Sequence, residues 1–573
     1  MTNEKNNNKE QGQNADNQSS GKQMIQIRRN GDTLPPKPVI ASKQKRENTL
    51  QKEKQSSKKT DQNDQVKPDK KSKNDSSINK DDKNGKNDEI STSLDQIKTR
   101  LKDEVGYEIS FDIVVREMTI GDKPIILFYM NGLVNSELLT DVLNRLTYVD
   151  KEELGERTYY DFLKRYIPSN QASKEESWNS MLTAVLSGAA ALFIEGEQAA
   201  IIVDAKEFPC RSLEEPSLEK VVRGSRDGFN ESLMINITLV RRRIRDPQLR
   251  YELIRVGERT QTDVCIAYLD DIVDKEMLEA YKSKVKGVCL DGLPLADKQL
   301  EEATVNRGWN PFPLVRYSER PDTVSEHLLE GSMAVFVDTS PSVMLLPTTY
   351  TDLIQHAEEA RQTPFIGTYL RWVRFFGILA SLIMLPLWLL FVTHPEFKPA
   401  MLEFLGPEKE GKIPLILQFL IAELGIDLMR MASVHTPSSL ATAMSLVAAI
   451  LIGDIAVKTG LFNNEVILYM SVSAVGMFAT PSYELGLANR IVRLVLLIAV
   501  GLFGATGFIV AITMILLFLV GARSLNRPYM WPFIPFDFKA VLAIIVRKPV
   551  LLSRKRPKIL RTQQRDKMPE ANS

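Results

Sequence analysis

The pattern of hydrophobic and polar positions divides this chain of 573 residues into four segments. Residues 1–95 are almost entirely Lys, Asn, Asp, Gln and Ser, residues 96–360 alternate short apolar runs with polar stretches, and residues 364–525 are hydrophobic. Residues 526–573 form a basic tail. The first segment cannot bury enough apolar surface to offset the conformational entropy lost on folding, so we expect a disordered Lys/Asn-rich tail.

The second segment predicts a cytosolic α/β domain with two similar subdomains. It contains two pairs of apolar runs separated by short turns, which is typical of β-hairpins. Each hairpin is followed by a polar, Pro-containing or helical stretch, and this similarity predicts the duplication. The hairpin strands are expected at 189–194 with 199–203 and at 333–337 with 342–346, further strands at 111–115, 124–130, 263–269 and 287–290, and helices at 228–245, 275–284 and 323–329.

The third segment predicts an α-helical transmembrane domain, because about 20 apolar residues suffice to span a bilayer. Segment 413–434 is apolar but carries Glu423, Asp427 and Arg430, so we expect a re-entrant or interfacial helix there. The prediction is therefore four crossings plus this charged helix. The four expected crossings are 375–392, 438–457, 466–480 and 492–522.

Charge asymmetry predicts the orientation, although the formal net charge of the whole chain is only +1. Arg361, Arg371 and Arg374 precede the first crossing. Residues 523–561, after the last crossing, are rich in Lys and Arg and contain one acidic residue, Asp537. The positive-inside rule therefore places both termini in the cytosol.

The charged helix holds the main candidate residues for a pathway. Glu423, Asp427 and Arg430 recur at helical spacing and share one face. Ionisable groups at membrane depth are costly and usually face a cavity, a pore or each other, so this face is a candidate pathway lining. The alternative is an interfacial amphipathic helix whose polar side lies in water, with Asp427 and Arg430 as an ordinary ion pair.

Glu484 is a further pathway candidate, because it follows a Pro-containing linker and precedes two basic residues. It is expected either to pair with Arg490 or Arg493 or to lie in a gate at headgroup level. Asp454 and Lys458 are four residues apart and are expected to neutralise each other rather than bind an ion.

Gly501, Gly504 and Gly507 recur every three residues in the last apolar stretch. Small residues permit close helix–helix approach, and glycines also soften a helix, so these positions are expected to serve packing or a hinge. The aromatic and proline-rich stretch 528–536 is expected to anchor the chain at the cytosolic interface.

No catalytic site is predicted, because the chain lacks the GxSxG, GxxxxGK[ST] and HExxH patterns. The 4 histidines do not pair at ligand spacing and the 3 cysteines form no CxxC, so neither a metal site nor a cofactor is expected. The basic cluster at 241–245 is interpreted as an internal salt-bridge face, and no nucleic acid is expected as a partner.

Several motifs resemble the GerA family, the A subunits of spore germinant receptors. The similarity covers about residues 95–550, and within the family the chain looks most like the stage V sporulation protein AF branch. The motifs that resemble the family lie at 221–232, 241–247, 259–264, 319–322, 329–331, 451–461 and 481–489, and those that resemble the branch lie at 367–377 and 435–437.

This resemblance implies a multi-pass protein of the inner membrane of a bacterial endospore, with both termini on the spore-core side. It implies a homo-oligomeric ion channel that works with a B-type membrane subunit and, in full receptors, a C-type lipoprotein. The soluble region would receive the signal. The alternatives are a non-conducting receptor or scaffold subunit that recruits other germination proteins, and an active transporter, for which an inverted repeat is expected but not seen.

Overall fold

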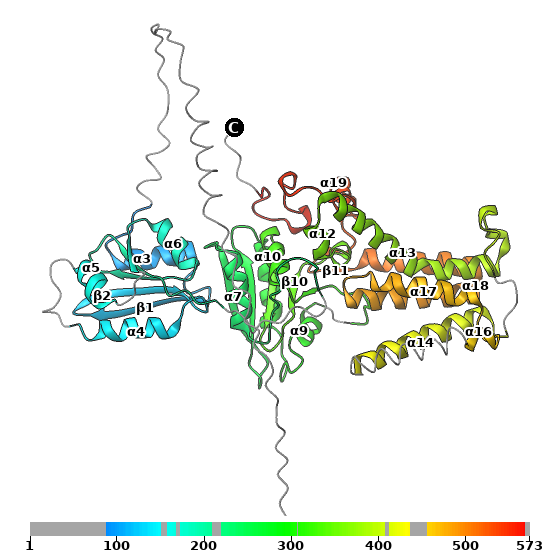
Figure 1. The fold of residues 1–573 in the computed structure, drawn as a ribbon, viewed down its shortest axis with the longest axis horizontal. Helices are drawn as coiled ribbons and strands as arrows, with labels where there is room; N and C mark the ends of the chain where they lie inside the picture. The colour runs from blue at the N-terminus through cyan, green and yellow to red at the C-terminus, as the bar shows by residue number, and fades with distance from the viewer. Residues whose placement is uncertain are drawn as a thin grey trace, which may run out of the picture. The chain divides into compact units, whose positions relative to one another are not determined.

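The computed structural model describes residues 88–149, 158–167, 172–208, 219–305, 308–406, 412–435 and 455–567 (Figure 1). The expected tail lies mostly outside these residues. The folded part begins before the expected end of the tail at residue 95. Ile90 is fully buried, and helix α3 starts at Leu94.

The first subdomain is a five-stranded antiparallel sheet between two layers of helices. Its strand order is β1-β2-β4-β5-β3. Figure 1 shows α3 and α6 on one side of this sheet and α4 on the other. Strands β4 and β5 are buried along their whole length, which fits a central position between two helical layers. The elements are α3 (Leu94–Arg100), η1 (Leu101–Val105), β1 (Ile113–Ile120), β2 (Lys123–Met130), α4 (Ser136–Thr147), α5 (Thr158–Asp161), η3 (Phe162–Tyr166), β3 (Ala172–Glu175), α6 (Trp178–Leu186), β4 (Ala190–Ile194) and β5 (Ala200–Val203).

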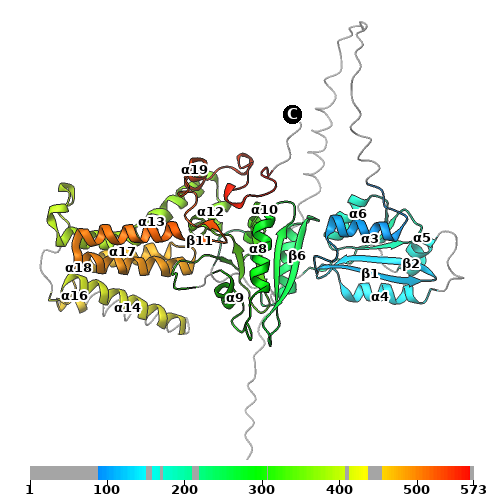
Figure 2. The same ribbon diagram turned by 180° about the vertical axis from the view of Figure 1, so that it is seen from behind.

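The second subdomain repeats this arrangement. Its sheet has the order β6-β7-β9-β10-β8. In both sheets the chain forms a hairpin, then an edge strand, and then a second hairpin that lies between the first hairpin and that edge strand. The core on one face involves α7 and α10 and that on the other α8 and α9; Figure 2 shows the α8 side. The prediction of two similar subdomains is confirmed. The elements are α7 (Leu233–Arg243), β6 (Leu249–Val256), β7 (Thr262–Leu269), α8 (Lys275–Lys286), α9 (Ala296–Thr304), β8 (Arg316–Ser318), α10 (Pro321–Glu330), β9 (Met333–Val337) and β10 (Val343–Leu346).

The strand predictions hold for both hairpins and for β1, β2 and β7, but the strand expected at 287–290 is wrong. That short apolar run follows the end of α8 and forms a loop, in which Leu290 accepts a hydrogen bond from the Glu258 backbone. Edge strand β6 was not predicted, because the charged residues in LRYELIRV hide its alternation.

Among the described residues, the hydrophobic region contains four long helices that pack on one another. Two helices of the described residues are long and apolar enough to cross a membrane: α13, with 30 residues, and α18, with 39. The contact between α13 and α17 depends on small residues, because a Cβ at Gly476 would collide with the Gly377 carbonyl. The helices are α11 (Tyr350–Leu353), α12 (Ala357–Arg361), α13 (Pro364–Thr393), α14 (Leu415–His435), α16 (Ala456–Lys458), α17 (Asn464–Phe478) and α18 (Tyr483–Gly521), with short helical turns η4 (Pro395–Phe397) and η5 (Ala400–Leu402).

Helix α18 is a helical hairpin rather than one straight rod. Gly504 has φ 57° and ψ −137°, outside the helical region. Leu485 and Leu519 belong to one packed cluster with Phe312, whereas they would lie ~50 Å apart in a straight helix. Residues 492–522 therefore form parts of two helical arms rather than one continuous helix, because the chain reverses direction at Gly504, and the number of crossings stays a prediction.

The hairpin and the C-terminal segment return to the second subdomain. The Ser524 hydroxyl donates to the Leu314 carbonyl and accepts from the Thr348 backbone, at 2.7 and 3.1 Å.

Of the expected crossings, 438–457 lies almost wholly outside the described residues, and 466–480 corresponds to α17. The remaining elements are β11 (Arg523–Ser524), β12 (Arg527–Pro528), α19 (Phe538–Ile545), η7 (Val550–Leu552) and η8 (Lys558–Leu560).

Candidate functional site: a buried charge cluster among apolar helices

Glu423 lies at the centre of a charge cluster between the apolar helices. It projects from α14 and is 1% exposed. Its Oε1 lies 2.6 Å from Nε of Arg493, an ion pair whose N–H is not aligned as a hydrogen bond, and its Oε2 accepts from Nη2 of Arg493 at 2.9 Å. The same Oε2 lies 3.2 Å from Nε of Arg490. One carboxylate therefore pairs with two guanidinium groups that are both buried.

Arg493 joins three further helices to α18. Its Nη1 donates to the Ser473 hydroxyl of α17 at 2.6 Å, and to the carbonyl and hydroxyl oxygens of Ser381 on α13 at 3.0 and 3.2 Å. The Ser473 hydroxyl in turn donates to the Ser381 carbonyl at 3.0 Å. Since Glu423 belongs to α14, the guanidinium of Arg493 contacts α13, α14 and α17 at one point.

Asp427, one helical turn after Glu423, lies at the edge of the cluster. Its carboxylate pairs with Arg490 of α18, not with Arg430 of its own helix as the alternative interpretation expected. The Asp427 side chain is 41% exposed, whereas those of Glu423 and Arg490 are almost fully buried. Asp427 is therefore the accessible carboxylate of the cluster.

Arg430 lies near the end of α17 and the start of α18 rather than in the cluster. Its Nη2 lies 3.0 Å from the Met477 sulfur, and its guanidinium lies 5.9 Å from the centre of the Tyr483 ring. Glu484 directly follows Tyr483 in sequence, and its carboxylate accepts a hydrogen bond from the Ser482 hydroxyl at 3.3 Å near the start of α18. The structure thus brings Glu423 and Asp427 together with Arg490 and Arg493, and places Glu484 outside that group.

The three glycines lie at close contacts around the α18 hairpin. A Cβ at Gly501 would collide with Ile416 of α14, one at Gly504 with His394 after α13, and one at Gly507 with the Ala499 carbonyl in the other arm.

Asp454 lies outside the described residues, so its expected pairing with Lys458 does too.

Two arginines of the predicted salt-bridge face at 241–245 pair with aspartates. Arg241 pairs with Asp112 of the first subdomain at 2.9 Å, and both side chains are 2% exposed. Arg243 pairs with Asp227 at 2.5 Å. Nη2 of Arg320, a fully buried side chain, donates to the Ser225 carbonyl at 3.1 Å. The motif around Ser225 is therefore held in place by ion pairs and hydrogen bonds.

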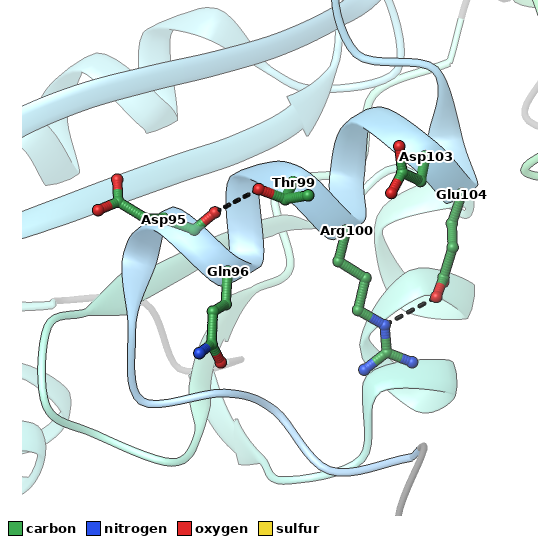
Figure 3. Close-up of a pocket in the computed structure, with 6 residues that line it drawn as sticks. All are labelled: Asp95, Gln96, Thr99, Arg100, Asp103 and Glu104. Atoms are coloured by element: carbon green, nitrogen blue, oxygen red, sulfur yellow. Dashed lines mark hydrogen bonds and ion pairs between the residues drawn. The ribbon is translucent and has the colours of Figure 1, made fainter.

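A surface depression of about 480 Å³ lies along α3 and η1 (Figure 3). Arg100 and Glu104 form an ion pair at 2.8 Å there. All its lining residues come from one short stretch of chain, 95–104, so polar groups from several elements do not converge on it. The charge cluster remains the better candidate.

Sequence reasoning missed Ser381 and Ser473, and it considered Arg490 and Arg493 only as alternative partners for Glu484. The available signal was spacing: Ser381 follows Gly377 by four residues, and Ser473 precedes Gly476 by three. Small residues at such spacing on apolar helices mark close helix contacts. They do not say which charged residue lies at the contact.

Comparisons with known proteins place these observations in a family. The model of the Bacillus/Clostridium GerA spore germination protein family matches residues 96–559. Stage V sporulation protein AF of Bacillus subtilis (strain 168) is 46% identical over 468 residues, which cover 82% of this chain and 95% of that protein. Spore germination protein KA of the same strain is 30% identical over 474 residues, covering 82% and 87%. The crystal structure of the N-terminal domain of the A subunit of the Bacillus megaterium spore germinant receptor GerK3 is 26% identical with a TM-score of 0.37, covering 46% of this chain and 97% of that one.

Proposed function

Since this chain belongs to the GerA family of Bacillus/Clostridium spore germination proteins, we propose that it is an oligomeric ion-conducting subunit of the germination machinery. The observation that carries the proposal is the Glu423 cluster, in which a buried carboxylate and two buried guanidinium groups lie among apolar helices. Ionisable residues in such helices commonly mark ion pathways.

The cluster fits the closed state of a gate. Glu423 is neutralised by Arg490 and Arg493, so it offers no free negative charge to a cation. A movement of α14 relative to α18 would separate these charges and leave Glu423 and Asp427 facing the same space. Separating a buried ion pair costs several kcal/mol, so the open state is rare without a signal. A signal on the soluble domain or from a partner must therefore bind the open state more tightly than the closed state.

The proposed setting follows from the family. The protein would cross the spore inner membrane several times, with both termini on the core side. It would assemble with further copies of itself and with a B-type membrane subunit, and in a full receptor with a C-type lipoprotein. Glu423, Asp427, Arg430 and Glu484 are the proposed pathway residues, with Gly501, Gly504 and Gly507 as packing or hinge positions.

The second candidate is a non-conducting receptor or scaffold subunit. It is favoured by the contacts of Arg493 with Ser381 and Ser473, because polar contacts of this kind also serve only to join helices. In that case the charge cluster stabilises the helix bundle, and germination partners are recruited through the soluble domain.

Potassium flux from vesicles separates the two candidates. The full chain is reconstituted with and without a co-expressed B-type subunit, and efflux is followed with a potassium electrode. For a conducting subunit, Glu423→Gln should raise basal efflux, because the closed-state pairing is lost, and Asp427→Asn should lower stimulated efflux. Glu396→Gln is the matched control, because that side chain is 76% exposed. If spores carrying Glu423→Ala and Asp427→Ala released monovalent cations at the normal rate, the pathway assignment would fail.

A further inference from the structure

The outer face of α19 is apolar and uncovered. Phe538 and Leu542, four residues apart on the helix, are 65 and 42% exposed, and Val546, which directly follows the helix, is 40% exposed, whereas Ile544 on the inner face is 8% exposed. The chain continues into Val550–Leu552, three aliphatic residues that are each at least 70% exposed. Large apolar side chains on one helix face are typical of a helix that lies on a membrane or a partner.

Helix α19 is held against the beginning of α13. Nη1 of Arg371 donates to the carbonyls of Ala543 and Ile544 at 3.0 and 2.6 Å. Nε1 of Trp372 donates to the Ile545 carbonyl at 3.1 Å. These bonds satisfy carbonyl groups at the C-terminal end of α19, which otherwise have no partner within the helix.

The length of α13 indicates the level of this contact relative to a bilayer. The helix has 30 residues and is therefore ~45 Å long, whereas a hydrocarbon core is ~30 Å thick. Its uncharged part begins after Arg374, so its first turns extend beyond the core. Phe365, Tyr369 and Trp372 are exposed on those turns, and aromatic residues favour the headgroup level. Helix α19, bonded to the same turns, lies at that level too.

Exposed basic side chains are interspersed in sequence with these apolar residues. Lys539, Lys548, Arg554 and Lys555 are all exposed. The one acidic residue in 523–561, Asp537, lies 3.1 Å from Lys558 and caps the start of α19. The segment thus combines an apolar face with an excess of positive charge.

We propose that α19 and residues 546–555 form a docking surface for the anionic phospholipid headgroups of the cytosolic leaflet. The apolar side chains enter the headgroup–acyl boundary, and the basic side chains contact lipid phosphates. This inference rests on the proposed membrane location of α13. It commits to lipid rather than to a second copy of the chain, because the positive charge of this segment opposes an identical segment and complements an anionic surface.

A nitroxide on Leu542→Cys in the full chain tests the proposal. Cys210→Ser and Cys289→Ser remove the other labelling sites, while the buried Cys265 is kept. The label's collision rates with oxygen and with a water-soluble nickel chelate are compared in phosphatidylcholine vesicles with and without phosphatidylglycerol. The oxygen-to-nickel ratio should exceed that of a label on native Cys289, and it should rise when phosphatidylglycerol is added.

Two double variants show whether the basic side chains cause that rise. Lys539→Gln/Lys548→Gln should reduce it strongly, with Arg554 and Lys555 still present, whereas Lys284→Gln/Lys286→Gln, two exposed lysines on α8, should leave it intact. Each basic residue near an anionic surface corresponds to roughly a fivefold preference for that surface.

The proposal is overturned if the ratio equals that at Cys289, if phosphatidylglycerol has no effect, or if spin–spin broadening shows a second label on the same face. Potassium efflux is measured in the same vesicles. Lost efflux with an intact phosphatidylglycerol response contradicts only the conducting function, and the reverse result contradicts only the lipid surface.

Discussion

Replacing Arg493 by methionine should destabilise the helix bundle by about 3–5 kcal/mol, the cost of breaking a buried ion pair from one side. Arg493 is 1% exposed, and its guanidinium contacts Glu423, Ser381 and Ser473. The value should lie near the lower end of that range, because Glu423 keeps Arg490 at 3.2 Å. Glu423→Leu should lie near the upper end, because it leaves two guanidinium groups without their shared carboxylate.

The double variant Arg493→Met/Glu423→Leu gives the sharper measurement. It removes both charges of the 2.6 Å pair, so neither is left buried alone. Its destabilisation should be smaller than the sum of the two single effects by about 1–3 kcal/mol, the usual coupling between contacting residues.

Thermal unfolding of the purified full chain in detergent, followed by tryptophan emission, measures these effects. A loss of 1 kcal/mol lowers the Tm of a large domain by about 2 °C, so Arg493→Met should lower it by ~6 °C or more. Arg523→Met, at an exposed arginine beyond the end of α18, is the control for the loss of one charge. The reasoning is refuted if Arg493→Met behaves like this control, or if the two single effects add fully in the double variant.

Three further predictions concern other parts of the chain. Gly504→Ala should cost about 1–3 kcal/mol because φ there is 57°, whereas Gly521→Ala, with open space around it, should be close to neutral in the same thermal assay. Asp112→Asn should destabilise the soluble region by about 3 kcal/mol because Arg241 stays buried without its counter-charge; urea unfolding that matches the unaltered protein would contradict this. Burial lowers the pKa of His356 from 6.5 to about 4, so the unfolded chain binds a proton first as the pH falls. Stability should therefore decrease between pH 6.5 and about 4, and His356→Gln should reduce that slope in denaturant titrations at several pH values.

Much of the soluble fold could be predicted because its strands are short apolar runs bounded by turn residues. Both β-hairpins and β7 follow this pattern, and the repeated order of elements indicated the duplication. The failures have a common physical cause. Residues 287–290 are apolar but form a largely exposed loop after α8, and β6 contains charged residues because it lies at a sheet edge, so local hydrophobicity did not indicate the backbone conformation at either place.

The family could be predicted from several motifs, and the comparisons confirm it. The site could be predicted only in part. Helical spacing placed Glu423 and Asp427 on one face, but spacing within one helix cannot say which residue of another helix faces them. The pairing of Glu423 with Arg490 and Arg493 depends on how α14 and α18 pack, which local sequence does not encode. The reversal at Gly504 was hidden in a continuous apolar stretch, because a glycine there is compatible with both a helix and a turn.

The α18 hairpin also connects the soluble region to the far end of the apolar helices. Leu485 in one arm and Leu519 in the other belong to one cluster with Phe312 of the soluble region, so both ends of the hairpin would move with that region. The Gly504 turn lies at the far end of the arms, ~30 Å away by helix rise. A rotation of about 5° at the soluble end would displace the turn by roughly 2–3 Å over that length. A rearrangement too small to alter the fold of the second subdomain would thus reach the opposite end of the helices as a displacement the size of an ion.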